Sequence, residues 1–233
     1  MDLFEEYVKG YDFNNDKIVR KYKHTLRVKA LCEVIAEDLN LNNEQKKIAS
    51  LCGLYHDIAR FEQATRYNSF DDDKTIDHGD LGYEIFLNEF ADKLQLNQKD
   101  RMIIAKSILY HNKYDVEAVS EEELLFIKIV RDADKIDILY QYANVPGMLR
   151  DGKSAISIKC HEEFMKHHPL KWGDIINKRD GILLSLAFVW DLNFPCSFKI
   201  IKENKYYEKM EKVLNNEVFS QYFAIIKSYL KEK

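Results

Sequence analysis

The sequence has few of the residues that interrupt helices, with only 3 prolines and 8 glycines among its 233 residues. Average usage is roughly 5% for proline and 7% for glycine, so both residue types are scarce here. A chain of this length can bury a sizeable core, and the shortage of breakers favours long helices. We find no internal repeat, no low-complexity segment and no convincing strand pattern. The sequence therefore predicts an all-α protein.

Long apolar runs and an excess of one charge are also missing. The formal net charge is −4, and it is spread along the chain in mixed-sign runs. This balance argues against a polynucleotide or an anionic membrane as a partner. No apolar run reaches the length of a bilayer span, and the first residues lack the pattern of a signal peptide. We therefore expect a cytoplasmic protein with no membrane association.

Paired cysteines are absent as well. The four cysteines stand far apart, without the C-x-x-C spacing that most thiolate zinc sites show. They are typical of buried thiols in a reduced compartment. Their positions are Cys32, Cys52, Cys160 and Cys196. The chain also lacks a P-loop, a G-x-G-x-x-G pattern, an H-E-x-x-H pair and a G-x-S-x-G elbow, which excludes the enzyme classes built on them.

Apolar residues at helical spacing predict a series of helices. Asn15 or Asp16 can cap the first, Asp77 can cap a short helix beginning at His78, and Ser120 with Glu123 forms a capping box. Pro169 and Pro195 mark joints between later helices. The predicted helices cover residues 17–39, 44–60, 98–111, 121–138, 154–167, 174–192 and 202–230, with another starting at residue 78. The polar stretch 61–77 reads as a loop, either an active-site rim or a solvated insertion.

Imidazoles and carboxylates recur on the apolar faces of these helices, where they are costly to bury unless paired or bound to metal. A single histidine there is more often hydrogen-bonded than a ligand. Repetition across several helices favours a shared interior site, since packed helices can bring such side chains together. Imidazole and carboxylate suit iron, manganese, zinc or nickel. The residues concerned are His24, His56, Asp57, His78, His111, Asp132, Asp134 and Asp137.

The order and spacing of these residues over about 17–142 resemble the HD superfamily of metal-dependent phosphohydrolases. The matching elements are His24, the segment Leu54-Tyr55-His56-Asp57-Ile58-Ala59, Asp77-His78-Gly79-Asp80-Leu81-Gly82, Tyr110-His111-Asn112-Lys113 and Arg131-Asp132-Ala133-Asp134-Lys135-Ile136-Asp137. The resemblance implies a compact all-helical bundle of the HD type. It also implies a divalent metal held by His24, His56, Asp57 and one later aspartate.

Asp132 and Asp134 cannot both face one ion, because residues two apart on a helix point to nearly opposite sides. Asp134 lies in line with Ile127 and Val130, and the family's Ala-Asp-Lys/Arg motif resembles residues 133–135. We therefore assign Asp134 as the ligand. Asp137, one turn further on, is a candidate for a substrate contact.

His78 and His111 decide between one metal ion and two. In relatives with two metals the equivalent histidines bind the second ion, whereas in one-metal relatives nearby polar residues contact phosphate or transfer protons. Asn112 departs from the HD-GYP phosphodiesterases, which have a second adjacent histidine there, and Gly82-Tyr83 is not followed by proline. Cyclic-dinucleotide hydrolysis is therefore disfavoured, while both roles of the two histidines stay open.

The resemblance implies hydrolysis of a phosphate ester in a nucleotide or another small phosphorylated metabolite, through water activated by Mn, Fe, Zn, Co or Ni. Asp57 can orient the water, and His78 or His111 can protonate the leaving oxygen. Cations near the motifs can bind the phosphate. These candidates are Arg27, Arg60, Arg66, Lys113 and Lys135. Two alternatives remain: a di-iron oxygenase of HD-like fold, and a non-catalytic metabolite sensor.

We expect one helical domain over 1–233, with an HD core over about 17–142 and additional C-terminal helices over about 150–233. The substrate is expected to be a small molecule. The sequence leaves open whether the protein is a monomer or a homodimer.

Overall fold

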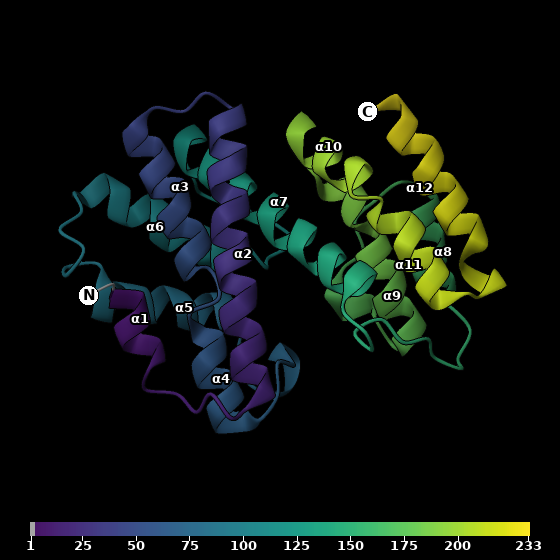
Figure 1. Ribbon diagram of the computed structural model, residues 1–233, viewed down its shortest axis with the longest axis horizontal. Helices are drawn as coiled ribbons and strands as arrows, with labels where there is room; N and C mark the ends of the chain where they lie inside the picture. The colour runs from purple at the N-terminus through teal and green to yellow at the C-terminus, as the bar shows by residue number, and fades with distance from the viewer. Residues whose placement is uncertain (1–2) are drawn as a thin grey trace. The chain divides into compact units, whose positions relative to one another are not determined.

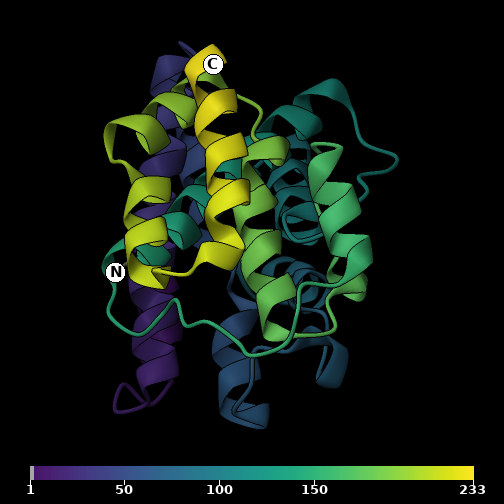
Figure 2. The same cartoon turned by 90° about the vertical axis from the view of Figure 1, so that its right-hand side faces the viewer.

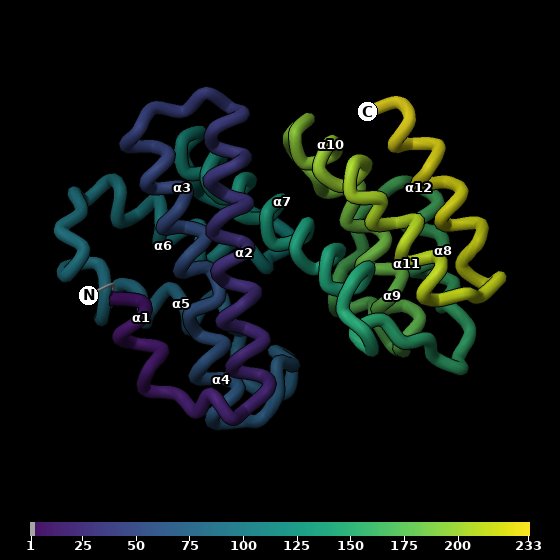
Figure 3. The backbone as a smooth tube through the Cα atoms, viewed as in Figure 1, coloured from purple at the N-terminus to yellow at the C-terminus, as the bar shows by residue number. Residues whose placement is uncertain are grey.

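The computed structural model describes residues 3–233, and these residues form helices, turns and loops without any strand. They divide into two compact units, residues 1–134 and 135–233, and the boundary falls inside the long helix α7 (Figure 3). The predicted all-helical fold is confirmed. None of the helices within 3–233 is both long enough and apolar enough to cross a membrane.

Unit 1 contains the helices that position the candidate site (Figure 1). Two shorter turns accompany them, a 3₁₀ turn over Asp72–Lys74 and a π-helical turn over Phe86–Phe90. The helices are α1 (Leu3–Val8), α2 (Asp16–Asp38), α3 (Asn43–Tyr55), α4 (Ala59–Tyr67), α5 (His78–Ile85), α6 (Gln98–Tyr110) and α7 (Glu121–Asn144), the last of which continues into unit 2.

The helix starts follow the capping chemistry of the sequence. The side chain of Asn15 accepts a hydrogen bond from the backbone N–H of Lys17, and the carboxylate of Asp77 accepts from two N–H groups at the start of α5. The Ser120 N–H donates to Glu123 Oε2, and the Glu123 N–H donates to Ser120 Oγ. Each side chain satisfies an N–H that has no partner inside its helix. The predicted caps are confirmed.

The predicted helix over 44–60 is wrong in one respect, because α3 ends at Tyr55 and α4 begins at Ala59. Between them the backbone turns tightly, with the Ile58 N–H donating to Tyr55 O at 3.1 Å and the Arg60 N–H to Asp57 O at 2.9 Å. These bonds span three residues instead of four, which tightens the chain as in a 3₁₀ turn. His56 and Asp57 therefore lie in a turn between two helices.

The predicted loop over 61–77 is also partly wrong, since its first part belongs to α4. Phe61 and Ala64 are buried at a spacing of three residues, and Gln63 is buried beside them. Charged residues on the outer face give this short amphipathic helix a polar composition, which resembles that of a loop. Asn68 ends α4 in the left-handed conformation, with φ of 49°.

α2 and α3 pack against each other along most of their length (Figure 1). α2 buries Val28, Cys32 and Ile35, and α3 contributes Cys52. Gly53 permits the close approach, because a Cβ atom there would lie 2.9 Å from Lys29 Cα. Full burial of such aliphatic side chains stabilises the pair by about 1.5–3 kcal/mol each. α6 then packs on α3, α5 on α6, and α4 on α2 and α5.

Unit 2 is built from shorter helices, and Figure 2 shows α12, in yellow, from the side. They are α8 (Ile158–Met165), α9 (Lys178–Leu186), α10 (Pro195–Glu203), α11 (Tyr206–Leu214) and α12 (Ser220–Glu232). Three 3₁₀ segments, Trp172–Asp174, Ala187–Asp191 and Glu217–Phe219, connect some of them. α9 packs on α8 and α12, and α11 packs on α10 and α12.

The predicted helices of this region are too long. The predicted helix over 154–167 corresponds to the shorter α8, and the one over 174–192 corresponds to α9 and the 3₁₀ segment that follows it. The predicted helix over 202–230 is interrupted at two positions. Lys205 and Asn215 adopt left-handed conformations, with φ of 53° and 42°, and so end the helical run. Pro195 occupies the first turn of α10, where its missing N–H costs nothing. All four cysteines are buried and free.

Candidate metal centre

Five elements of unit 1 bring together six of the eight residues that the sequence singles out. His24 lies within α2 and Asp134 within α7, whereas His78 is the first residue of α5. His56 and His111 directly follow the last residues of α3 and α6. Five of the six residues are buried, and the side chain of Asp134 is 18% exposed. These residues form two groups that could hold metal ions, His24–His56–Asp134 and Asp57–His78–His111.

The first cluster consists of His24, His56 and Asp134. His24 Nε2 lies 3.1 Å from Asp134 Oδ1 and 3.3 Å from His56 Nε2. His56 Nε2 lies 3.9 Å from the same carboxylate oxygen. Asp132 is buried as well, but among the described residues it belongs to neither cluster. The structure therefore places the aspartate that we assigned, Asp134, beside the histidines.

The second cluster consists of Asp57, His78 and His111. His78 Nε2 and His111 Nε2 lie 2.9 Å apart. Asp57 Oδ1 lies 3.5 Å from His78 Nε2 and 3.7 Å from His111 Nε2. Three potential ligand atoms thus converge on one buried point.

Asp57 joins the two clusters, because its second carboxylate oxygen faces the first one. Oδ2 lies 3.3 Å from His24 Nε2 and 3.5 Å from His56 Nε2. A carboxylate placed in this way can bind one ion through each oxygen. Two cations neighbour it: Lys21 Nζ lies 2.6 Å from Oδ2, and Arg60 Nε lies 3.5 Å from Oδ1.

The hydrogen bonds on the far side of the rings fit metal binding. His56 Nδ1 lies 2.8 Å from Gly53 O, and His111 Nδ1 lies 2.7 Å from Ile108 O. A carbonyl oxygen only accepts, so both Nδ1 atoms carry the proton. In the neutral rings each Nε2 atom then offers a lone pair, and these lone pairs point into the clusters. Because facing lone pairs repel, a divalent cation bound by them would offset this repulsion.

The protonation states also match the requirements of metal ligands. Burial lowers the pKa of His56, and burial together with the charge of Arg60 lowers the pKa of His78 to about 4. Burial alone would raise the pKa of Asp57, but Lys21 and the neighbouring histidines hold it well below the usual value. Burial opposes ionisation of Asp134 too, yet His24 lowers its pKa. Neutral imidazoles and ionised carboxylates are the forms that bind divalent metals.

The residues predicted to bind phosphate are distributed unevenly. Arg60 lies beside the candidate metal centre, where it pairs with Asp57 and Asp72. Lys113, two residues after His111, pairs with Asp77 and Asp80 at 2.7 and 2.9 Å. Arg27 is half-buried on α2, one turn beyond His24.

Arg66 does not join this group, because it is exposed near the end of α4 and pairs with Glu62. Lys135 and Asp137 belong to unit 2. There, Lys135 pairs with Asp191 at 2.9 Å, and the buried Asp137 accepts a hydrogen bond from Gln141 Nε2.

Sequence reasoning missed Lys21, Gln63 and Asp72. Lys21 lies one turn before His24, so its face on α2 was predictable, but a lysine there reads as a surface charge. Asp72 belongs to the acidic triplet Asp71-Asp72-Asp73 in the predicted loop over 61–77, and its Oδ2 lies 2.5 Å from His78 Nδ1. The sequence carries no signal that selects Asp72 from its two neighbours.

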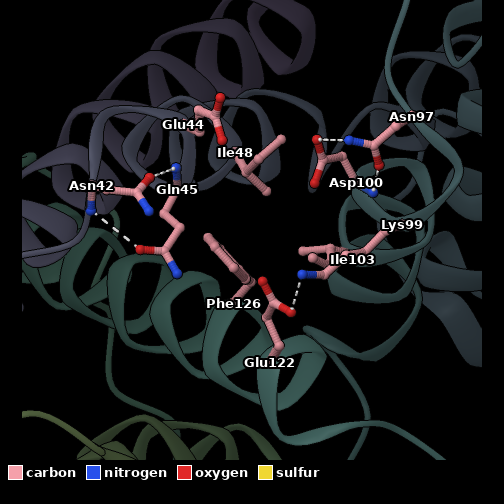
Figure 4. Close-up of a pocket in the computed structure, with 10 residues that line it drawn as sticks. All are labelled: Asn42, Glu44, Gln45, Ile48, Asn97, Lys99, Asp100, Ile103, Glu122 and Phe126. Atoms are coloured by element: carbon pink, nitrogen blue, oxygen red, sulfur yellow. Dashed lines mark hydrogen bonds and ion pairs between the residues drawn. The ribbon is translucent and has the colours of Figure 1, made fainter.

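A hollow of about 300 Å³ lies elsewhere in unit 1 (Figure 4). It is lined by residues at or near the beginnings of α3, α6 and α7, including Asn42, Asn97 and Glu122. α3 and α6 each have 13 residues, which at 1.5 Å per residue gives about 20 Å. His56 and His111 follow the opposite ends of these helices. The hollow is therefore separate from the candidate metal centre.

Comparison with known families agrees with this geometry. The model of the HD domain matches residues 22–139, about half of the chain. The chain therefore belongs to the HD domain family, as the motifs indicated, and the match includes all six residues of the two clusters. No curated protein and no solved structure gave a match. Most of unit 2 lies beyond the family match, as additional C-terminal helices.

Proposed function

We propose that this protein is a metal-dependent phosphohydrolase with two divalent ions, acting on a phosphate ester of a nucleotide or another small phosphorylated metabolite. The observation that carries the proposal is the position of Asp57, whose two oxygens face different pairs of imidazoles. His24, His56 and Asp134 would hold one ion together with Asp57 Oδ2. His78 and His111 would hold the other together with Asp57 Oδ1.

Bound divalent ions lower the pKa of a coordinated water and polarise a phosphoryl oxygen. We assign His78 and His111 to metal binding, and not to proton transfer, because each Nε2 atom faces Asp57 while Nδ1 is occupied. Asp57 is the remaining group of the predicted catalytic set. It would hold one ion at each carboxylate oxygen and would orient the attacking water.

Cations beside Asp57 favour an anionic substrate. Lys21 and Arg60 both approach its carboxylate, and Arg20 joins them around the ring of Phe70, each cation 5.2–5.5 Å from the ring centroid. Arg60 Nε is buried and lies 3.5 Å from Asp57 Oδ1, an ion-pair contact without hydrogen-bond geometry, so its N–H makes no hydrogen bond among residues 3–233. A phosphoryl oxygen bound next to Asp57 would satisfy it.

The same ligand set suits a di-iron oxygenase, so the cations distinguish the two candidates. Oxygen chemistry on an uncharged substrate needs no positive charge beside the bridging carboxylate, whereas phosphate esters do. We therefore favour hydrolysis. Oxygen consumption that depends on iron and on an added substrate would favour the oxygenase instead.

The test is a panel of nucleotides and small phosphorylated metabolites, offered to purified protein loaded with Mn²⁺, Fe²⁺, Co²⁺ or Zn²⁺. We expect release of inorganic phosphate or a phosphomonoester by the wild type and none by Asp57→Ala. Asp92→Ala is the matched control, because the side chain of Asp92 is 85% exposed and pairs with Arg101. Absence of hydrolysis by the metal-loaded wild type across the panel would contradict the proposal, as would activity in Asp57→Ala.

A further inference from the structure

The segment 68–76, between α4 and α5, is held in place by hydrogen bonds from two side chains of α4. Arg60 Nη1 donates to Phe70 O at 2.9 Å and to Asp72 Oδ1 at 2.8 Å. Gln63 Nε2 lies 2.9 Å from Asp72 Oδ1, 2.7 Å from Thr75 Oγ1 and 3.1 Å from Ile76 O. Gln63 is fully buried. These bonds hold the segment, and with it Asp72, in one place.

Asp72 accepts hydrogen bonds from three different side chains. Oδ1 accepts hydrogen bonds from Arg60 Nη1 and Gln63 Nε2, and Oδ2 accepts one from His78 Nδ1 at 2.5 Å. Only an ionised carboxylate can accept on both oxygens, since an amide would turn an N–H₂ group toward one of these donors. The aspartate is therefore matched to its donors in a way that asparagine is not.

The carboxylate fixes the tautomer of His78. With the proton on Nδ1, the Nε2 lone pair faces His111 and Asp57. Asn112 Nδ2 also approaches His78 Nδ1, at 3.3 Å, but it lies 3.2 and 3.3 Å from the two oxygens of Asp77. Without Asp72, the Asn112 amide would be the group that faces His78 Nδ1, and it could only donate a hydrogen bond to that atom. The proton would then move to Nε2, and His78 would no longer be a ligand.

His78 differs in this respect from two other histidines of the site. The Nδ1 atoms of His56 and His111 contact backbone carbonyls, which any sequence supplies. A carboxylate behind an imidazole orients the ring and makes it a stronger ligand, and its loss typically costs roughly 10- to 100-fold in metal affinity. The second cluster has this support at His78.

We propose that Asp72 is a positioning residue for the second metal ion, and that its hydrogen bond to His78, held in place by segment 68–76, controls the occupancy of that ion and not of the first. The inference rests on the proposed two-ion centre. It assigns to Asp72 a role that is separate from substrate binding. Metal binding without substrate can test it.

The experiment compares Asp72→Asn with Asp71→Asn by equilibrium dialysis of metal-free protein against Co²⁺ or Mn²⁺. Asp71 is the matched control, because its half-buried carboxylate pairs with Lys74 and carries the same charge one residue away. We expect Asp72→Asn to weaken the second ion by roughly 10- to 100-fold and to leave the first within about twofold. Asp71→Asn should match the wild type for both ions.

A second variant, His111→Ala, tests whether Asp72→Asn acts by positioning His78 or by disturbing the fold in general. In His111→Ala, which keeps only the first cluster intact, adding Asp72→Asn should leave the remaining ion unaffected. Equal weakening of both ions by Asp72→Asn, or no weakening of either, would overturn the inference. A wild type that binds one ion at saturation would overturn it too.

If Asp72→Asn fails to fold, the tautomer can be measured in the metal-free wild type by nitrogen NMR of the imidazoles. A proton on His78 Nδ1 supports the inference, and a proton on Nε2 contradicts it. None of these measurements involves a phosphoester. A protein that binds two ions as described but hydrolyses nothing would therefore contradict the proposed function alone.

Discussion

His78 Nε2 and His111 Nε2 lie 2.9 Å apart, although the Nδ1 atom of each ring already faces an oxygen that accepts its proton. Two lone pairs so close repel unless a cation lies with them. We therefore expect His111→Ala to reduce the tightly bound metal from two ions per chain to one, measured by metal analysis after gel filtration. His161→Ala is the control, since His161 contacts Tyr222 in unit 2. Two ions retained in His111→Ala would contradict the assignment.

Lys21 would compete with a metal ion at Asp57 Oδ2, because its Nζ lies 2.6 Å from that oxygen. Lys21→Met should therefore tighten metal binding in the absence of substrate, by about tenfold. The same change removes a cation that would face the phosphate of the proposed substrate, so kcat/KM should fall by about 100-fold. Lys23→Met, at an exposed position of α2, should change neither quantity. Metal affinity and kcat/KM moving in the same direction would contradict this role.

Gly79 lies where the start of α5 meets the end of α6. A Cβ atom at this position would lie 2.4 Å from Asn112 Oδ1 and 2.7 Å from Leu109 O, so neighbouring atoms would have to move. Gly79→Ala should lower the free energy of unfolding by about 1–3 kcal/mol, despite the higher helix propensity of alanine. A Cβ at Gly173 would meet nothing within 4 Å, so Gly173→Ala is the control. Urea unfolding that shows equal stability of both variants would contradict the packing described.

The metal-free protein should lose stability on mild acidification. Burial and the charge of Arg60 lower the pKa of His78 to about 4, and burial also lowers the pKa of His56. An unfolded histidine has a pKa near 6.5, so between about pH 6.5 and pH 4 the unfolded state binds more protons. The stability present above pH 6.5 is therefore lost across this window, by on the order of 1–3 kcal/mol.

Urea unfolding in the presence of a chelator, at pH 7 and at pH 5, measures this loss. His78→Gln lacks one of the titrating groups and should show a smaller difference between the two pH values. An equal difference in the variant, or greater stability of the wild type at pH 5, would contradict the account.

Local signals in the sequence predicted much of the fold. Helix starts at Asn15, Asp77 and Ser120 depend on side chains within three residues of the N–H groups that they satisfy, so spacing alone located them. The breaks at Lys205 and Asn215 were missed because neither residue requires a left-handed conformation. Helices in unit 2 therefore came out too long.

The residues of the candidate site were likewise predicted only in part. The sequence singled out all six residues of the two clusters, because imidazoles and carboxylates on apolar stripes are unusual. It could not find Lys21 or Asp72, whose charges are ordinary for an exposed helix face and a loop. Their roles follow only from distances across the fold, 36 residues apart for Lys21 and Asp57, and from the burial of Gln63 beneath segment 68–76.

The bridging position of Asp57 is tested most directly by counting metal ions during a Co²⁺ titration of metal-free wild type and Asp57→Ala. The wild type should bind two ions. Asp57→Ala should weaken both together, because each carboxylate oxygen faces one pair of imidazoles. Weakening of only one ion in Asp57→Ala, with the other bound as in the wild type, would contradict the bridge.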